Sequence, residues 1–312
     1  MEVSEILLTI LESVVFIVKS LYFVLEALVL KFVPVSYRAK DVSGETVLVT
    51  GAGSGLGRLM SIRFAKLGCR LVLWDINKAG LDETANAVKQ HGAISYTYVC
   101  DLSSRDDIYT AADKVKQEVG SVDILVNNAG IVTGKKFLDC PDSLIQKTME
   151  VNTSAHFWTC KAFLPAMLDK NHGHIVNVAS SAGLVGVNGL ADYCASKFAA
   201  VGFDESLRYE FIAQGKTGVH TTVVCPYYIN TGMFTGVKTK FPRILPIVEP
   251  EDAVDRIMNA VLVNQHIVMI PGILYLFMAL KGLIPTKAGL LFAEHFGINN
   301  CMDDFTGRQK QE

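Results

Sequence analysis

The stretch Thr50-Gly51-Ala52-Gly53-Ser54-Gly55-Leu56-Gly57 decides the fold of this chain. It follows the apolar run Val47-Leu48-Val49, and the residues from Leu56 to Leu67 carry apolar side chains at helical spacing. This order predicts a strand, a tight turn and a helix. Glycines let such a turn approach a pyrophosphate, because free N–H groups and the helix dipole favour negative charge at the amino end of the helix. The candidate cofactor contacts in the turn are Gly51, Ser54, Gly55, Leu56 and Gly57.

Asp75 follows the next apolar run, Leu71 to Trp74, and bears on the choice of cofactor. A carboxylate at the end of this second strand can accept hydrogen bonds from the adenosine ribose hydroxyls, and it repels the 2′-phosphate of NADP. The turn holds no lysine or arginine, and Arg58 follows it, already within the predicted helix. We therefore predict NAD as the cofactor; an exposed strand-end acid is the alternative interpretation of Asp75.

Five further apolar runs predict strands, and stretches with helical spacing lie between most of them. The runs are Tyr96 to Val99, Ile124 to Val126, Ile175 to Val178, Val219 to Val224 and Ile267 to Ile270. Strands that alternate with helices pair in parallel through right-handed crossovers. The predicted fold is therefore α/β: one doubly wound, Rossmann-type parallel sheet of about seven strands in residues 45–270.

Two later strand ends add candidate cofactor contacts at the carboxyl edge of the sheet, where ligands bind in open α/β folds. Asp101 and Leu102 follow the third strand, and Asp101 is a candidate partner for the adenine amino group. Asn127-Asn128-Ala129-Gly130 ends the fourth strand. We assign Asn128 to the cofactor site and expect Asn127 to tie neighbouring strands together.

The chemical step is indicated by Tyr193-Cys194-Ala195-Ser196-Lys197, which opens a long helical stretch. Tyr193 and Lys197 are four residues apart and therefore share one face of the helix. A nearby ammonium favours the phenolate, which can accept the proton of an alcohol. Ser180, at the end of the fifth strand, is a candidate holder of the substrate oxygen, and Asn152, in the helix after the fourth strand, a candidate to reach Lys197 through water.

Each of these four residues also has a purely structural interpretation. These are a core aromatic for Tyr193, a surface charge for Lys197, a helix cap for Ser180 and a helix-distorting polar group for Asn152. Together and in this order they predict an alcohol oxidoreductase site. The predicted catalytic residues are Asn152, Ser180, Tyr193 and Lys197, of which Tyr193 and Lys197 are also candidate cofactor contacts.

These motifs resemble those of the single-domain short-chain dehydrogenases/reductases, from about Val42 to Ile270. Within that superfamily, four segments resemble the epidermal retinol dehydrogenases of family 16C. They are Trp74-Asp75-Ile76-Asn77, Gly134-Lys135-Lys136-Phe137-Leu138-Asp139-Cys140-Pro141, Gly189-Leu190-Ala191-Asp192-Tyr193 and Cys225-Pro226-Tyr227-Tyr228. One departure is Tyr227, because the wider superfamily usually has glycine after this proline, and it affects the backbone on the nicotinamide side.

The resemblance implies a lipophilic alcohol as substrate, all-trans-retinol first and a hydroxysteroid second. It also implies attachment to the endoplasmic reticulum or to lipid droplets through a hydrophobic amino end. A lipid-droplet structural protein that keeps the fold without turnover is a third hypothesis, and the complete catalytic set argues against it.

Residues 1–33 are apolar and form a predicted membrane anchor. Four charged residues recur in this part of the chain at intervals of seven: Glu5, Glu12, Lys19 and Glu26. Because seven residues are nearly two helical turns, these charges form one narrow stripe. We expect an uncleaved anchor that spans the membrane, lies in its interface or forms a hairpin, and a buried packing helix is the alternative. If the segment spans, the basic residues after it keep the catalytic domain on the cytosolic side.

Residues 34–44 form a predicted polar linker, and residues 271–312 a C-terminal extension that begins with the apolar run Pro271 to Leu280. The extension is a candidate membrane or substrate contact, with dimer packing or a buried helix left open. A net charge of −2 with scattered basic residues makes nucleic acid an unsuitable partner. No histidine or cysteine spacing predicts a metal site. The expected partners are membrane lipid and a lipophilic alcohol, with a homodimer left open.

Overall fold

A computed structural model describes residues 3–307 of the chain. Residues 1–2 and 308–312, the outermost parts of the predicted anchor and C-terminal extension, lie outside the described residues. The chain divides into two compact units, Met1–Asp41 and Val42–Glu312. The boundary between them falls inside the predicted linker, and the second unit carries the sheet and every candidate site residue.

The second unit is built on a parallel sheet of seven strands in the order β3-β2-β1-β4-β5-β6-β7. The strands are β1 (Thr46–Thr50), β2 (Arg70–Asp75), β3 (Ser95–Val99), β4 (Ile124–Asn127), β5 (Gly173–Val178), β6 (Val219–Pro226) and β7 (Ile267–Ile270). All seven predicted strands are confirmed within a few residues. The strand order reverses between β1 and β4, which is where a doubly wound sheet binds its ligand.

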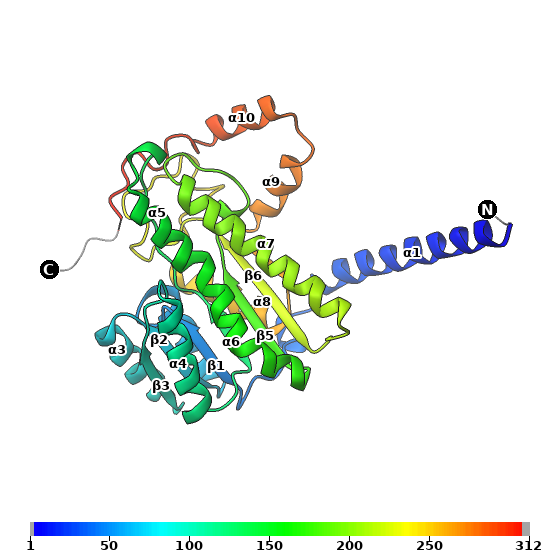
Figure 1. Cartoon of the computed structure of the whole chain (residues 1–312). Helices are drawn as coiled ribbons and strands as arrows, with labels where there is room; N and C mark the ends of the chain where they lie inside the picture. Colours follow the sequence, from blue (N-terminus) through cyan, green and yellow to red (C-terminus); the bar gives the residue numbers. More distant parts are fainter. Residues whose placement is uncertain (1–2, 308–312) are drawn as a thin grey trace. The chain divides into compact units, whose positions relative to one another are not determined.

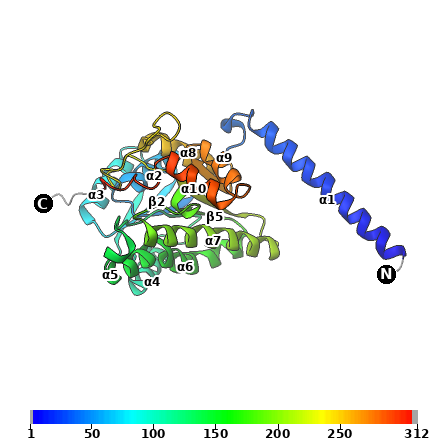
Figure 2. The ribbon, with the colours of Figure 1, turned by 90° about the horizontal axis from the view of Figure 1, so that it is seen from above.

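Helices cover both faces of this sheet (Figures 1 and 2). One layer holds α2 (Gly55–Lys66), α3 (Lys78–Lys89) and α8 (Pro250–Leu262). The other layer holds α4 (Arg105–Glu118), α5 (Asp142–Met149), α6 (Ala155–Lys170) and α7 (Ala191–Ala213). The central strands β1 and β4 are fully buried between the two layers, which explains their continuous apolar runs, whereas the edge strand β3 is partly exposed.

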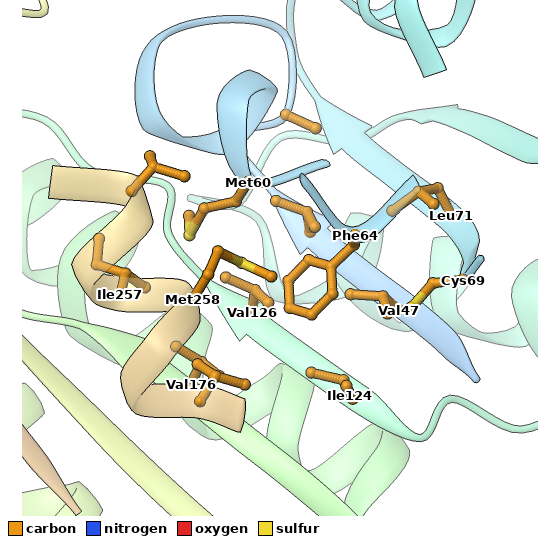
Figure 3. Close-up of a cluster of buried hydrophobic side chains, with 14 of the residues drawn as sticks. Val47, Met60, Phe64, Cys69, Leu71, Ile124, Val126, Val176, Ile257 and Met258 are labelled. Carbon is orange, nitrogen blue, oxygen red and sulfur yellow. The ribbon is translucent and has the colours of Figure 1, made fainter. Parts of the chain in front are cut away.

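A close-packed core joins β1 to the helices of the first layer (Figure 3). Met60 and Phe64 of α2 and Met258 of α8 pack over Val47 of β1, and all four side chains are buried. Removing a side chain of this size from water contributes about 1.5–3 kcal/mol. This packing fixes the amino end of α2 directly after the carboxyl end of β1, where the glycine-rich turn lies.

The amino-terminal unit consists mainly of one helix, α1 (Val3–Leu30), followed by a short 3-10 turn at Val35–Tyr37. Within the described residues, Ser4–Leu30 is long and apolar enough to cross a membrane, with a mean hydropathy of 2.1. Its large apolar side chains are exposed to solvent. The helix is continuous, so the hairpin form of the anchor does not occur between Val3 and Leu30.

The C-terminal extension forms two helices after β7, α9 (Ile273–Lys281) and α10 (Thr286–His295). Several large apolar side chains of this segment are exposed. Leu283, between the two helices, is 80% exposed, and Leu290 and Leu291 of α10 are 64% and 67% exposed. Other side chains of these helices line a cavity against the loops that follow β5 and β6.

Candidate active site

The glycine-rich turn between β1 and α2 has the backbone shape that a close ligand requires. Gly51 and Gly55 adopt φ values of +66° and +53°, which side-chain-bearing residues rarely adopt. A Cβ atom on Gly57 would lie 2.2 Å from the carbonyl oxygen of Gly51. The turn thus admits no side chain at these positions and leaves room for a phosphate group at the amino end of α2.

The turn opens into a cavity of about 400 Å³ at the point where the strand order reverses. All but one of the predicted cofactor contacts line this cavity: Gly51, Ser54, Gly55, Leu56, Asp75, Asp101, Leu102, Asn128, Tyr193 and Lys197. The exception is Gly57, which lies beneath the turn and allows α2 to pack close to it. The lining residues therefore fit an extended dinucleotide.

Asp75 holds the turn as well as facing the cavity. Its Oδ2 accepts a hydrogen bond from the Gly53 amide at 2.8 Å, and its Oδ1 accepts one from the Asn77 amide at 2.9 Å. The Asn77 contact is a local turn that an exposed strand-end acid also makes, whereas the contact with Gly53 ties Asp75 to the glycine-rich turn. The carboxylate is thus fixed at the cavity wall.

Asp101 follows β3 and Asn128 follows β4, at the same edge of the parallel sheet. The Asp101 Oδ1 accepts hydrogen bonds from the amide and the hydroxyl of Ser103 at 2.9 and 2.7 Å. Burial alone raises the pKa of Asp101, but the two hydrogen bonds from Ser103 and the charge of Lys147 together hold the pKa below its usual value. Asn128 Nδ2 donates to the Thr50 carbonyl at 2.8 Å, so this side chain ties β4 to β1 while it lines the cavity.

Asn127 ties strands together, as its position in the sequence predicts. Its Nδ2 donates to Asn177 of β5 at 3.0 Å, and its Oδ1 accepts from the Thr159 hydroxyl of α6 at 2.7 Å. The side chain is buried and away from the cavity.

Tyr193, Ser180 and Lys197 meet at the inner end of the cavity. Tyr193 lies in the first turn of α7 and is 4% exposed. Burial raises the pKa of the Tyr193 phenol, and a hydrogen bond with Ser180 acts in the opposite direction. Lys197 donates from Nζ to the Val178 carbonyl at 2.9 Å, and its Nζ lies 5.6 Å from the centre of the Tyr193 ring. Burial lowers the pKa of Lys197 to about 8.

This geometry allows a proton to move at the Tyr193 hydroxyl. A protonated Lys197 stabilises the phenolate. Its charge therefore offsets part of the rise in the pKa of the Tyr193 phenol that burial causes. Ser180 sits after the end of β5, where its Oγ accepts from the Ala182 amide at 3.1 Å. The three side chains together suit oxidation of an alcohol whose oxygen lies between Tyr193 and Ser180.

Asn152 differs from its expected setting. It lies in a π-helical turn, Glu150–Ser154, between α5 and α6, rather than in a regular helix. Its Oδ1 accepts from the Ile131 amide at 2.8 Å, and its Nδ2 donates to the Ile131 carbonyl at 2.9 Å and to Ser196 Oγ at 3.0 Å. Both amide hydrogens are therefore in use, and the side chain anchors α7 to the segment after β4. The water bridge to Lys197 stays a prediction.

His156, one turn after Asn152, was not among the predicted site residues. It is fully buried, and neither ring nitrogen has a hydrogen-bond partner among residues 3–307. Burial and the nearby Lys197 lower the pKa of His156 to about 3, so the ring is neutral at physiological pH. The apolar periodicity of α6 does not distinguish this buried, neutral histidine from the core residues around it.

A second cavity, of about 440 Å³, adjoins the first on the side of α9 and α10. The two cavities share Ser180, Tyr193, Tyr227 and Phe234. Tyr227 is the departure from glycine noted in the sequence, whereas nothing in the sequence pattern indicates Phe234, whose ring lies 5.8 Å from that of Tyr193. The remaining lining is mostly apolar and includes Phe277 and Phe296.

The last described residues, 298–307, form what we term the C-terminal strap, which crosses the loops on the substrate side. The Thr306 amide donates to the Thr235 carbonyl at 2.9 Å. The Phe305 ring lies 6.3 Å from Phe234, which in turn contacts Tyr193. The strap thereby supports an aromatic wall beside the catalytic tyrosine.

Comparisons with known proteins identify the family of the chain. The family model described as short chain dehydrogenase matches residues 45–241. The chain is 53% identical to epidermal retinol dehydrogenase 2 of Mus musculus, covering 96% of this chain and 98% of that protein. It is 49% identical to short-chain dehydrogenase/reductase family 16C member 6 of Bos taurus, covering 96% and 95%.

A solved structure gives the same result for the fold. It is a short-chain dehydrogenase/reductase from Burkholderia phymatum in complex with NAD, with a TM-score of 0.70 and 26% identity, covering 78% of this chain and 95% of that one. The predictions of family, fold and cofactor are confirmed. The chain belongs to the short-chain dehydrogenase/reductase family, within its branch 16C, and is an NAD-dependent alcohol dehydrogenase.

Proposed function

We propose that the protein oxidises a lipophilic primary alcohol, all-trans-retinol, to the aldehyde retinal. The observation that carries this proposal is the apolar cavity, which meets the cofactor cavity at Tyr193 and Ser180. Apolar walls favour a hydrocarbon chain, at about 25 cal/mol for each Å² of apolar surface removed from water. The names of the relatives, epidermal retinol dehydrogenase 2 above all, support the choice of retinol.

In this proposal each polar side chain has one task. NAD, when bound, supplies the acceptor for the hydride that leaves the carbinol carbon. Ser180 Oγ holds the substrate oxygen, and Tyr193 Oη takes its proton. Lys197 stabilises the tyrosinate through its charge, and the aromatic wall that includes Phe234 keeps water from the reacting carbon.

A panel of alcohols tests the substrate. Full-length protein in microsomes is supplied with NAD and all-trans-retinol, a hydroxysteroid or a short-chain alcohol, and NADH formation is recorded. We expect the highest kcat/KM with retinol, because the cavity is apolar and lined by aromatic rings, and no NADH from the Tyr193→Phe control. A higher value for the hydroxysteroid would transfer the proposal to that substrate, and no NADH with any alcohol would favour the structural hypothesis.

Replacing Asp75 with serine is expected to narrow the preference for NAD over NADP by about tenfold or more. The change removes a carboxylate that accepts ribose hydrogen bonds and that repels a 2′-phosphate. Dissociation constants for NADH and NADPH, together with kcat/KM for both oxidised cofactors, measure the effect. A wild-type protein that is more efficient with NADP than with NAD would show that Asp75 does not have this role.

We infer that α1 attaches the protein to the endoplasmic reticulum membrane or to lipid droplets, with the catalytic domain in the cytosol. The exposed apolar side chains along Ser4–Leu30 support this inference. The charged stripe can stay at the level of the headgroups while the other faces enter the lipid. The exposed leucines of α9 and α10 provide a second candidate contact with lipid; their alternative role is packing in a homodimer.

A fusion of residues 1–38 to a soluble fluorescent protein is expected to sediment with membranes and to resist high-salt and carbonate washes. Ten large apolar side chains contribute about 1.5–3 kcal/mol each on burial, far more than a few charges oppose. The control carries aspartate at Ile10, Ile17 and Val24, on a face away from the charged stripe, and should be soluble. A wild-type fusion in the soluble fraction would rule out the anchor, and protease protection of the catalytic domain in intact microsomes would rule out the cytosolic orientation.

A further inference from the structure

The guanidinium of Arg58 is enclosed by the glycine-rich turn and α3. Its Nη2 donates to the Gly53 carbonyl at 2.6 Å, to the Gly80 carbonyl at 3.4 Å and to Glu83 Oε2 at 2.7 Å. Its Nε donates to Thr84 Oγ1 at 3.1 Å. Arg58 therefore joins the first turn of α2 to the cofactor loop on one side and to α3 on the other.

Gly53 is consequently held through both of its backbone polar groups. Asp75 accepts from its amide at 2.8 Å, and Arg58 donates to its carbonyl at 2.6 Å. A side chain at position 53 would disturb this arrangement, because a Cβ on Gly53 would lie 2.9 Å from Asp75 Oδ2. The same two residues thus determine where the backbone between Gly51 and Gly55 runs.

We propose that Arg58 is a cofactor-positioning residue: with Asp75 it fixes the pyrophosphate-binding turn, and Glu83 keeps its guanidinium on the turn and away from a ribose 2′-phosphate. Arg58 and the ribose-binding carboxylate of Asp75 share the partner Gly53, so this arginine lies close to the position of a 2′-phosphate. Charge-assisted hydrogen bonds to Glu83 and to the carbonyls satisfy it elsewhere. Asp75 thus sets the preference for NAD, and Arg58 holds the turn that both cofactors contact.

The proposal rests on the nicotinamide cofactor and is independent of the alcohol. Its test accordingly measures binding alone, by fluorescence titration of the full-length protein in detergent with NADH and with NADPH, without any alcohol. Failure of the retinol proposal would leave these dissociation constants unchanged, so the two proposals are tested separately.

Arg63 provides a matched control on the same helix. Its Nε pairs with Asp255 of α8 at 2.8 Å, and its side chain is 32% exposed, against 31% for Arg58. The Arg63 pair lies outside the lining of the cofactor cavity. Arg58→Leu and Arg63→Leu thus each remove one arginine and one ion pair of similar geometry, and only the first removes the contact with the turn.

Arg58→Leu is expected to weaken NADH and NADPH binding in the same proportion, by about tenfold, because positioning affects both cofactors alike. Arg58→Lys should bind both cofactors nearly as weakly as Arg58→Leu does. A lysine keeps the charge but cannot form hydrogen bonds with the turn and with α3 at the same time. Arg63→Leu should bind as the wild type does. In the double variant Asp75→Ser, Arg58→Leu the loss should be smaller than the product of the two single losses, because both residues hold Gly53.

Three results would overturn the proposal. One is an NADH dissociation constant for Arg58→Leu within twofold of wild type. Another is an equal loss for Arg63→Leu, which would indicate a general effect on α2. The third is a selective loss of NADPH in Arg58→Leu, which would make Arg58 a phosphate ligand. If Arg58→Leu does not fold, Arg58→Lys decides between the outcomes in the same way.

Discussion

Tyr193→Phe is expected to lower kcat/KM for alcohol oxidation by a factor of about 10³ or more while NADH binds within a few fold of wild type. The change removes only the phenolic oxygen, which moves the proton and contributes little to the cofactor contact. Tyr193 is buried between the two cavities, so phenylalanine fits the same space. NADH formation with saturating alcohol, and NADH fluorescence for binding, measure the two parts.

Lys197→Ala is the companion variant, and it should lose both turnover and cofactor binding. Lys197 lines the cofactor cavity and also carries the charge beside the phenol. A Tyr193→Phe protein that kept a substantial share of wild-type activity on its best alcohol would disprove the assignment of the acid/base. A loss of NADH binding as large as that of Lys197→Ala would instead assign Tyr193 mainly to the cofactor.

Gly57→Ala is expected to have the second largest effect, on cofactor binding. The new Cβ would lie 2.2 Å from the Gly51 carbonyl oxygen and 2.7 Å from Asn128 Nδ2, so α2 must move away from the turn or the turn must move into the cavity. Overpacking of this kind costs about 1–3 kcal/mol of folding free energy. Because the displaced group is the phosphate-facing turn, we expect NADH affinity to fall by about tenfold or more.

Gly202→Ala is the matched control for this substitution. Gly202 lies inside α7, and a Cβ there would meet nothing within 4 Å. Alanine in a helix is more favourable than glycine by up to about 1 kcal/mol, so the variant should be as stable as wild type or more so, with unchanged NADH binding. Equal NADH affinities for Gly57→Ala and wild type would contradict the role given to the close approach of α2 and the turn.

The parts of the molecule that the sequence predicts well are those in which local pattern and tertiary packing demand the same residues. Strands buried on both faces must be continuous apolar runs, and this makes β1 and its neighbours visible in the sequence. The spacing of Tyr193 and Lys197 follows from helix geometry alone. Gly57 is also predictable from the sequence, because the glycine that close packing of α2 requires is part of the glycine-rich motif.

Other features depend on contacts between segments that are distant in the sequence. The π-helical turn at Asn152 leaves no mark on the apolar periodicity, because one extra residue per turn is absorbed within a polar stretch. Phe234 and Phe305 are apolar residues in loops, and only the folded chain brings them beside Tyr193. The ion pair of Arg58 with Glu83 joins residues that belong to different helices, so no spacing rule indicates it.

The C-terminal strap has a consequence for the order in which the enzyme is made. The ribosome releases the seven strands before residues 298–307, and domains begin to fold during synthesis. The nascent chain can therefore assemble its glycine-rich turn before the aromatic wall beside Tyr193 is supported. A polypeptide cut short before the strap would still hold NADH, but its aromatic wall would lack the support of Phe305. Full support of the aromatic wall thus depends on residues 298–307, which follow the whole sheet in the chain.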